Sequence, residues 1–258
     1  MKNSKLFKLS LTLILAMGMV FTSCKKDEPD PEPNQHNDAF ADVFIKNIIP
    51  GPGAPSLYGV TLYAGGEGLT SCTVTGPSGA EFTLGEYWKG AGNLRKHPSM
   101  LPADGEMTTT IPPTGNYVFT LTFDDGETKE IIDELTDVVT NSMLPIAGMT
   151  SYDSDTNTIS ASWGAIENID AYMLKLTDAD KNASKPLFVN IMPNTMTSYE
   201  FDSATSDANP GWLQSPPNDG DEAYVFLVGV KYEAGAEGAT KENNKQMVTA
   251  SAKYIEIW

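Results

Sequence analysis

The sequence predicts an all-β fold made of two β-sandwiches in tandem, and three observations support this prediction. Apolar and polar residues alternate with a period of two along most of the chain beyond residue 38, as they do in half-buried strands. The alternating runs end in Gly, Pro, Asn or Asp, which are the residues that form turns. Roughly 220 residues follow the N-terminal segment, and this length suffices for two domains with separate cores.

The N-terminal half, residues 39–140, contains about seven candidate strands, spaced as in a two-sheet sandwich. The clearest run is Tyr117–Phe123, in which the alternate residues Tyr, Phe, Leu and Phe form one apolar face. The candidate strands are Val43–Ile49, Leu57–Ala64, Leu69–Thr75, Ala80–Leu84, Met107–Ile111, Tyr117–Phe123 and Thr128–Ile132.

The segment that joins the two halves fits two alternatives. Between Lys129 and Ser142 the apolar residues match either a short helix or a continuous strand. We place the boundary between the two domains near Thr140.

The C-terminal half, residues 141–258, has aromatic residues at defined places in its predicted strands. Thr158–Trp163 predicts a strand that ends in tryptophan, and Ala171–Leu176 predicts a strand with a tyrosine near its start. Ala223–Val230 and Met247–Ile257 predict two later strands. This pattern resembles the second, third, sixth and last strands of the fibronectin type III family.

That resemblance implies an immunoglobulin-like β-sandwich that serves as a spacer, adhesion or docking module rather than as an enzyme. It also implies that Tyr224 occupies the tyrosine-corner position of the sixth strand. The segment Asp202–Asp221 departs from the family because it is longer than the usual connection into that strand.

The first 23 residues have the three parts of a secretory signal. Three lysines precede an apolar run of roughly 13 residues, which is too short to span a hydrocarbon core of about 30 Å. Small residues then lead to Cys24. Phe21–Cys24 resembles the lipobox of bacterial lipoproteins, which implies removal of residues 1–23 and a lipid anchor on Cys24. The alternative is an ordinary signal peptide with a coincidental cysteine.

Residues 24–38 predict a disordered tether. Pro29, Pro31 and Pro33 alternate with acidic residues, which favours extended polyproline II structure of roughly 40 Å. Lys26-Asp27-Glu28 resembles the acidic export signal of Bacteroidota surface lipoproteins, which implies exposure on the outer face of the outer membrane. The alternative is an acidic tether without any targeting signal.

The charge of the chain argues against nucleic acid as a partner. The net charge is −17, and removing residues 1–23 takes away three lysines and no acids. The remaining 14 basic and 34 acidic groups give a net charge near −20, which repels phosphates and anionic headgroups.

The sequence lacks the motifs of catalysis and of metal binding. Cys72 is the one cysteine left after lipidation, and His97 is the one histidine outside the tether. No zinc spacing, phosphate loop, nucleophile elbow or dinucleotide fingerprint is present. Acidic runs at Asp153–Asn157 and Asp178–Asn182 lack the glycine and glutamate of a calcium loop and are typical of turns. We therefore expect no enzyme activity, cofactor or metal.

Two segments are candidates for ligand binding. The loop Gly85–Glu106 gathers aromatic and basic residues, including the only arginine of the chain, and the loop Asp202–Asp221 contains Trp212. Exposed aromatic rings beside fixed donors suit a sugar face or a protein contact. The alternative is that the aromatic side chains only plug the ends of the sandwiches. The candidate residues are Tyr87, Trp88, Lys89, Arg95, His97 and Trp212.

Together these features predict a non-catalytic, lipid-anchored protein of the outer-membrane surface that binds an extracellular glycan or protein. The alternative is a structural or spacer subunit of an outer-membrane assembly that has no small-molecule ligand.

Overall fold

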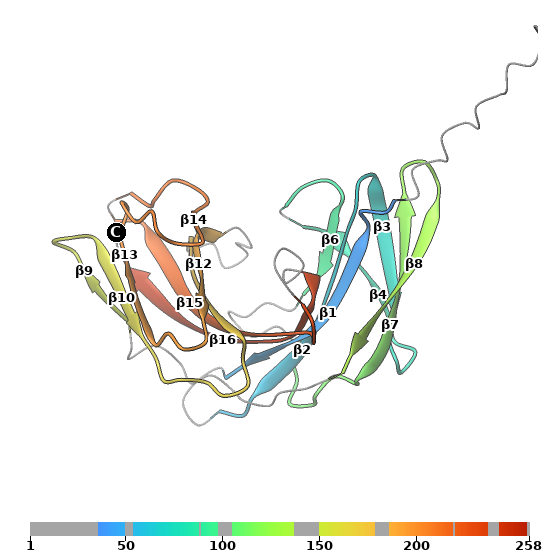
Figure 1. Ribbon diagram of the computed structural model, residues 1–258, viewed down its shortest axis with the longest axis horizontal. Helices are drawn as coiled ribbons and strands as arrows, with labels where there is room; N and C mark the ends of the chain where they lie inside the picture. The colour runs from blue at the N-terminus through green and yellow to red at the C-terminus, as the bar shows by residue number, and fades with distance from the viewer. Residues whose placement is uncertain are drawn as a thin grey trace, which may run out of the picture. The chain divides into compact units, whose positions relative to one another are not determined.

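The computed structural model describes the chain in eight segments, and every regular element in them is a β-strand (Figure 1). The described residues are 36–49, 54–87, 89–97, 105–136, 150–178, 186–218, 220–236 and 243–256. The chain divides into two units, Met1–Asn37 and Asp38–Trp258, and all the strands belong to the second unit. Within the described segments, no helix has the length and apolar character needed to cross a membrane.

A nine-stranded sheet, which we call sheet A, extends through both halves of the folded unit. In sheet order its strands are β14 (Pro210–Trp212), β12 (Pro186–Pro193), β11 (Ala171–Asp178), β15 (Glu222–Tyr232), β16 (Lys245–Glu256), β1 (Phe40–Ile48), β2 (Leu57–Gly65), β6 (Asn93–Lys96) and β5 (Gly85–Glu86). Neighbouring strands are antiparallel except β1 and β16, which pair in parallel with Ile45 opposite Met247.

Two smaller sheets complete the fold. Sheet B has the order β4 (Glu81–Thr83), β3 (Leu69–Thr75), β7 (Gly115–Phe123) and β8 (Thr128–Leu135). Sheet D has the order β13 (Ser198–Phe201), β10 (Thr158–Ser162) and β9 (Thr150–Asp153).

The first sandwich forms where sheet B packs on β1, β2 and β6 of sheet A. Strand β7 contributes the alternating apolar face that the sequence predicts, since Tyr117 and Phe119 are buried and Val118 between them is only partly buried. Val43 and Leu62 from sheet A meet this face in one hydrophobic cluster. Burying such side chains stabilises the sandwich by about 1.5–3 kcal/mol for each.

The second sandwich forms where sheet D packs on β11, β12 and β15. Trp163 is 7% exposed and contacts the ring of Tyr172 edge-on at 5.3 Å. Strands β10 and β11 are the second and third strands of this half, and β16 is the last, as predicted. These two sandwiches confirm the predicted fold class.

Tyr224 differs from the prediction. Ala223 and Val225 point into the second core, so strand alternation places Tyr224 on the opposite face of β15. A tyrosine corner requires a side chain on the core side. Tyr224 therefore does not fill that position.

Sheet A joins the two sandwiches covalently and through hydrogen bonds. Met247 of β16 is fully buried in the first core, and Val248 faces a third apolar cluster on the other side of the sheet. The predicted boundary near Thr140 lies outside the described residues, so the division at that residue stays a prediction.

Other segments also differ from the predicted elements. Met107–Ile111 forms only an isolated bridge, between Tyr58 and Thr108. The loop Gly85–Glu106 contains the short strands β5 and β6. Strand β8 agrees with the predicted strand Thr128–Ile132 and extends it to Leu135, so the strand alternative holds for the described part of the joining segment. The sequence pattern did not predict the strands β9, β12, β13 and β14. Residues 1–35, with the signal segment, Cys24 and most of the tether, lie outside the described residues.

Candidate functional site

The β5–β6 hairpin positions the basic residues of the candidate site. Gly85 lies opposite Arg95, and the amide of Tyr87 donates a hydrogen bond of 3.0 Å to the carbonyl oxygen of Asn93. Gly92 has a φ of 76°, which a side chain would strain. Because Leu94 points into the first core, alternation places Arg95 on the other face of sheet A.

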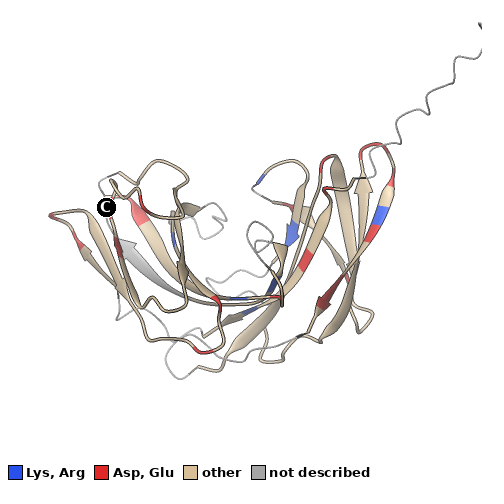
Figure 2. Ribbon diagram, in the orientation of Figure 1, with Lys and Arg blue, Asp and Glu red and all other residues tan. Residues whose placement is uncertain are grey.

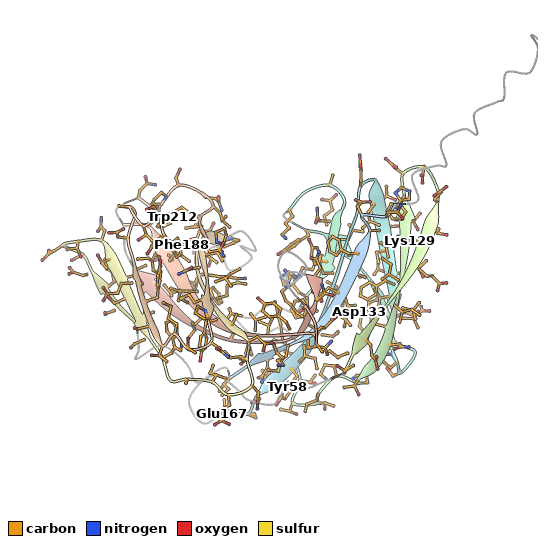
Figure 3. The ribbon with its side chains drawn as sticks, in the orientation of Figure 1. Tyr58, Lys129, Asp133, Glu167, Phe188 and Trp212 are labelled. Atoms are coloured by element: carbon orange, nitrogen blue, oxygen red, sulfur yellow. The ribbon has the colours of Figure 1, made fainter. Side chains whose placement is uncertain are left out.

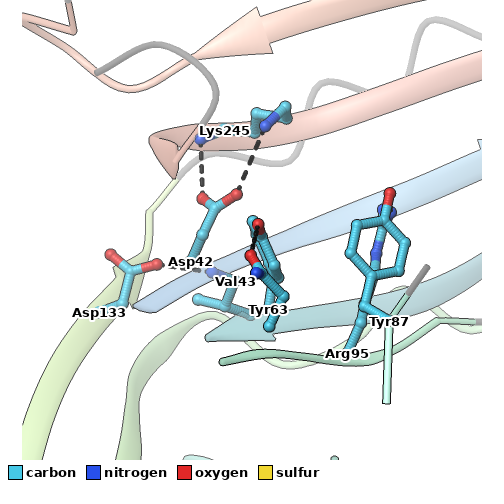
Figure 4. Close-up of polar contacts among 8 residues, drawn as sticks. Asp42, Val43, Tyr63, Tyr87, Arg95, Asp133 and Lys245 are labelled. Atoms are coloured by element: carbon cyan, nitrogen blue, oxygen red, sulfur yellow. Dashed lines mark hydrogen bonds and ion pairs between the residues drawn. The ribbon is translucent and has the colours of Figure 1, made fainter. Parts of the chain in front are cut away.

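Arg95 is held between the rings of Tyr87 and Phe44, and Figure 4 shows it beside Tyr87. Its Nη1 donates a hydrogen bond of 2.6 Å to the hydroxyl of Tyr87. Its guanidinium carbon lies 4.8 Å from the ring centroid of Tyr87 and 5.7 Å from that of Phe44. The Nε–H is buried and has no hydrogen-bond acceptor among the described residues. Because this Nε–H is buried, a ligand does not reach it, and the half-buried guanidinium can meet a ligand only through its Nη groups.

Tyr63 adds a buried ring to the same face of sheet A. It lies opposite Arg95 in the β2–β6 register, and its ring meets that of Tyr87 edge-on at 5.5 Å. Lys89 Nζ lies 5.6 Å from the centroid of the Tyr63 ring. The Tyr63 hydroxyl donates a hydrogen bond of 2.8 Å to Oδ1 of Asn93. Burial raises the pKa of Tyr63, so this hydroxyl stays protonated. We call Phe44, Tyr63, Tyr87, Lys89 and Arg95 the aromatic–cation cluster.

The cluster is the local exception in an acidic protein. Acidic residues are distributed over both sandwiches, whereas β6 carries Arg95 and Lys96 in succession (Figure 2). Phe44 and Tyr63 are buried and form a floor, Tyr87 and Arg95 are half-buried, and Lys89 is exposed. A cation above an aromatic face contributes about 0.5–2 kcal/mol.

Three of the six predicted binding residues come together in this cluster: Tyr87, Lys89 and Arg95. Trp88 lies outside the described residues. His97 follows β6 and is half-buried.

Trp212 lies on β14, at the opposite edge of sheet A from β5. Its ring meets Phe188 edge-on at 5.1 Å, and its Nε1 donates 3.1 Å to the carbonyl oxygen of Asp202 (Figure 3). Trp212 thus covers the second core and does not join the cluster.

Sequence reasoning missed Phe44 and Tyr63 as members of the site. Both residues belong to strands that were predicted, and strand alternation separates two faces without saying which face meets the core. Their pairing with the β5–β6 hairpin depends on tertiary register, which no local pattern specifies.

An acidic group adjoins the cluster. Asp42 lies opposite Tyr63 in the β1–β2 register and is fully buried. Oδ1 of Asp42 accepts a hydrogen bond of 2.9 Å from the amide of Lys245. Nζ of Lys245 forms an ion pair of 3.7 Å with Oδ2 of Asp42. Burial raises the pKa of Asp42 to about 6, and the Lys245 charge opposes this shift only in part. Asp133 and Glu233 each place a carboxyl oxygen within 4.8 Å of a carboxyl oxygen of Asp42. Lys245 supplies the positive charge there, so we assign no metal ion.

The side chains of the first acidic run, Asp153–Asn157, form hydrogen bonds within the turn between β9 and β10. Asp153 Oδ1 accepts 2.9 Å from the amide of Asp155, and Tyr152 donates 2.6 Å from its hydroxyl to Asn157 Oδ1. Asn157 has a φ of 51°, as a turn requires. Residues 179–182 of the second run lie outside the described residues.

A groove of about 460 Å³ opens beside β6, between sheets A and B. Val60 and Phe82 give it an apolar side. Lys96 and Glu106 on its rim form an ion pair of 2.7 Å, so their charges satisfy each other.

Two sandwiches that share one long sheet define an all-β protein. No family model and no curated protein matches the chain. The crystal structure of the chicken CNTN1 FN1-FN3 domains is similar, with a TM-score of 0.25 and 12% identity. That similarity covers 84% of this chain and 66% of the other one. The sandwich assignment rests on the strand pairing and the separate cores.

Proposed function

We propose that this protein is a non-catalytic binding protein of the cell surface, and that its ligand is an extracellular glycan or protein. The observation that carries the proposal is the aromatic–cation cluster, in which the half-buried guanidinium of Arg95 lies between Tyr87 and Phe44 and the side chain of Lys89 is exposed. The partly exposed ring of Tyr87 beside two cations suits the face of a sugar ring or an anchoring side chain of a protein.

The rigidity of the cluster supports this proposal. Arg95 is fixed by its hydrogen bond to Tyr87, and Tyr63 is fixed by its bond to Asn93. Preorganised side chains lose little conformational entropy when a ligand binds, so more of the contact energy appears as affinity.

A non-catalytic role is supported by the state of the cysteine. Cys72 is fully buried, and burial raises the pKa of its thiol to about 12. A thiol in this state does not supply the thiolate that a nucleophile requires.

We propose an outer-membrane surface location, with lipid on Cys24 and the folded unit held outward by the tether. The support is in the sequence, in the short apolar run, Phe21–Cys24 and the Pro-rich acidic segment. Mass spectrometry of the native N-terminal peptide tests the anchor, and protease treatment of intact cells tests the exposure. An unmodified thiol at Cys24 would overturn the anchor.

A spacer subunit of an outer-membrane assembly is the second candidate function. The continuity of sheet A favours it, because hydrogen bonds between β1 and β16 resist bending between the sandwiches. In that case the protein sets distance and docks to membrane partners, without a small ligand.

Binding measurements on the purified full-length protein separate the two functions. A glycan array and a pull-down of surface proteins identify the ligand, and calorimetry measures its affinity. We expect Arg95→Ala to weaken binding at least about tenfold, since a charge-assisted hydrogen bond and a stacked guanidinium are lost. Arg95→Lys keeps the charge and should restore only part of the affinity.

Lys129→Ala on β8 is the matched control, because it removes a cation from the other sheet (Figure 3). Equal affinity of the wild type, Arg95→Ala and Lys129→Ala would refute the proposed site. Co-purification with membrane partners and no ligand in any assay would favour the spacer.

A further inference from the structure

Three carboxyl groups from separate elements meet beside the start of β16. Asp42 comes from β1, Asp133 from β8, and Glu233 directly follows β15. One oxygen of each lies within 4.8 Å of the other two. These residues belong to the two sheets of the first sandwich and to the end of the β15–β16 pair.

Each of the first two carboxyl groups already bridges elements (Figure 4). Asp133 Oδ2 accepts 2.6 Å from the amide of Val43, which links sheet B to sheet A. Asp42 Oδ1 accepts 2.9 Å from the amide of Lys245, which links β1 to β16. Gln246 adds a parallel link, because its Oε1 accepts 2.8 Å from the amide of Thr136 just after β8.

The third carboxyl group, that of Glu233, interacts with the carboxyl group of Asp133. One carboxyl oxygen of Asp133 lies within 4.8 Å of one of Glu233, and the effect of each group on the pKa of the other is that of a hydrogen bond between the two carboxyl groups. Two ionised carboxylates have no donor, so this bond requires one proton between them. Oδ2 of Asp42 and Oε1 of Glu233 are buried and have no hydrogen-bond partner among the described residues.

We propose that Asp42, Asp133 and Glu233 form a proton-dependent latch that holds the first sandwich to the β15–β16 pair. The latch is closed while Asp133 and Glu233 share a proton, and it loosens when all three carboxyl groups are ionised. Three negative charges then face the ammonium of Lys245 and the more distant guanidinium of Arg95 from β6.

The pKa shifts have the direction that the latch requires. Burial, then the charges of Asp133 and Asp42, raise the pKa of Glu233 to about 7. Burial also raises the pKa of Asp133 and that of Asp42, the latter to about 6. The folded protein thus holds protons that the unfolded chain has released above about pH 4.5. The contribution to stability is present at low pH and is lost as the pH rises through about 6 to 7.

The test is thermal unfolding of the full-length protein between pH 5.5 and 8 in the presence of a chelator. We expect the midpoint of the wild type to fall by roughly 3–6 °C over this range. Glu233→Gln keeps a donor for Asp133 at every pH, so we expect a much flatter profile and a higher midpoint at pH 8. Glu130→Gln, an exposed change on β8, is the matched control and should retain the wild-type slope.

Hydrogen exchange locates the effect. After correction for intrinsic rates, amides of residues 40–48 and 128–135 should exchange several-fold faster at pH 8 than at pH 6 in the wild type, but not in Glu233→Gln. If Glu233→Gln fails to fold, Asp133→Asn replaces it, and its pH slope should again be reduced. Equal slopes in the wild type and the variant would overturn the proposal. A midpoint at pH 8 that rises with added Ca²⁺ only in the wild type would also overturn it, by making a metal ion the partner of the carboxyl groups.

Discussion

The hydroxyl of Tyr87 accepts a 2.6 Å hydrogen bond from Nη1 of Arg95, whose guanidinium carbon also lies 4.8 Å from the centre of the Tyr87 ring. Tyr87 and Arg95 come from the two sides of the β5–β6 hairpin and hold each other in place. The same contact therefore supports the hairpin and orients the donors of the guanidinium.

Tyr87→Phe removes the hydroxyl and keeps the ring. We expect a loss of about 1 kcal/mol in the free energy of unfolding, because one charge-assisted hydrogen bond is lost in a half-buried place. Urea titration of the purified protein measures this loss. Tyr199→Phe is the control, since its bond to Asp207 is 3.3 Å long and its hydroxyl is near solvent, and it should change stability by less than about 0.5 kcal/mol. Equal stability of both variants would mean that the Arg95 bond adds nothing.

Gly92→Ala should disturb the hairpin more than Gly90→Ala. Both glycines have positive φ, 76° and 98°, so each alanine pays a conformational cost of about 1–2 kcal/mol. A Cβ on Gly92 would also lie 2.5 Å from the carbonyl oxygen of Gly66, whereas a Cβ on Gly90 meets nothing within 4 Å. We expect Gly92→Ala to be the less stable by at least about 1 kcal/mol in urea titrations. Similar values for the two variants would argue against the close approach at Gly66.

The strand pattern of β7 could be predicted from sequence because one of its faces meets the core and the other meets solvent. Strand β12, by contrast, is buried on both faces over most of Pro186–Pro193, so apolar residues occur in succession and no alternation appears. Strand β14 has only three residues, too few for any period to be read.

The site could be predicted only in part, because the pairing of distant strands brings some of its residues together. The composition of residues 85–106 pointed to Tyr87, Lys89 and Arg95 as neighbours along the chain. The floor of Phe44 and Tyr63 depends on which strands pair with β6. The link between Asp42 and Lys245 spans 203 residues of sequence, and it depends on the parallel pairing of β1 with β16. Local propensities do not encode pairings of this range.

The thiol of Cys72 should resist modification in the folded protein. Its pKa is raised to about 12 by burial, so the thiolate is scarce at pH 8, and the side chain is fully buried in the first core. We expect a chromogenic thiol reagent to give no colour with the folded protein in native buffer. In denaturant it should detect one reactive thiol per lipidated chain. Rapid reaction in native buffer would contradict the burial and would reopen a nucleophilic role for Cys72.

Phe188→Ala should be among the most destabilising changes in the second sandwich. Phe188 is fully buried, and its ring stacks on Phe201 with centroids 4.4 Å and planes 4° apart, while Trp212 closes the third side. Removing it leaves a cavity that two aromatic neighbours cannot fill, so we expect a loss of about 3–5 kcal/mol in the free energy of unfolding. Leu213→Ala is the matched control, because this neighbour of Trp212 is 44% exposed and should cost less than about 1 kcal/mol. Urea titration followed by tryptophan fluorescence measures both variants. A loss below about 1 kcal/mol for Phe188→Ala would show that the aromatic stack is not packed as described, and Trp212 would again be available as a ligand-binding residue.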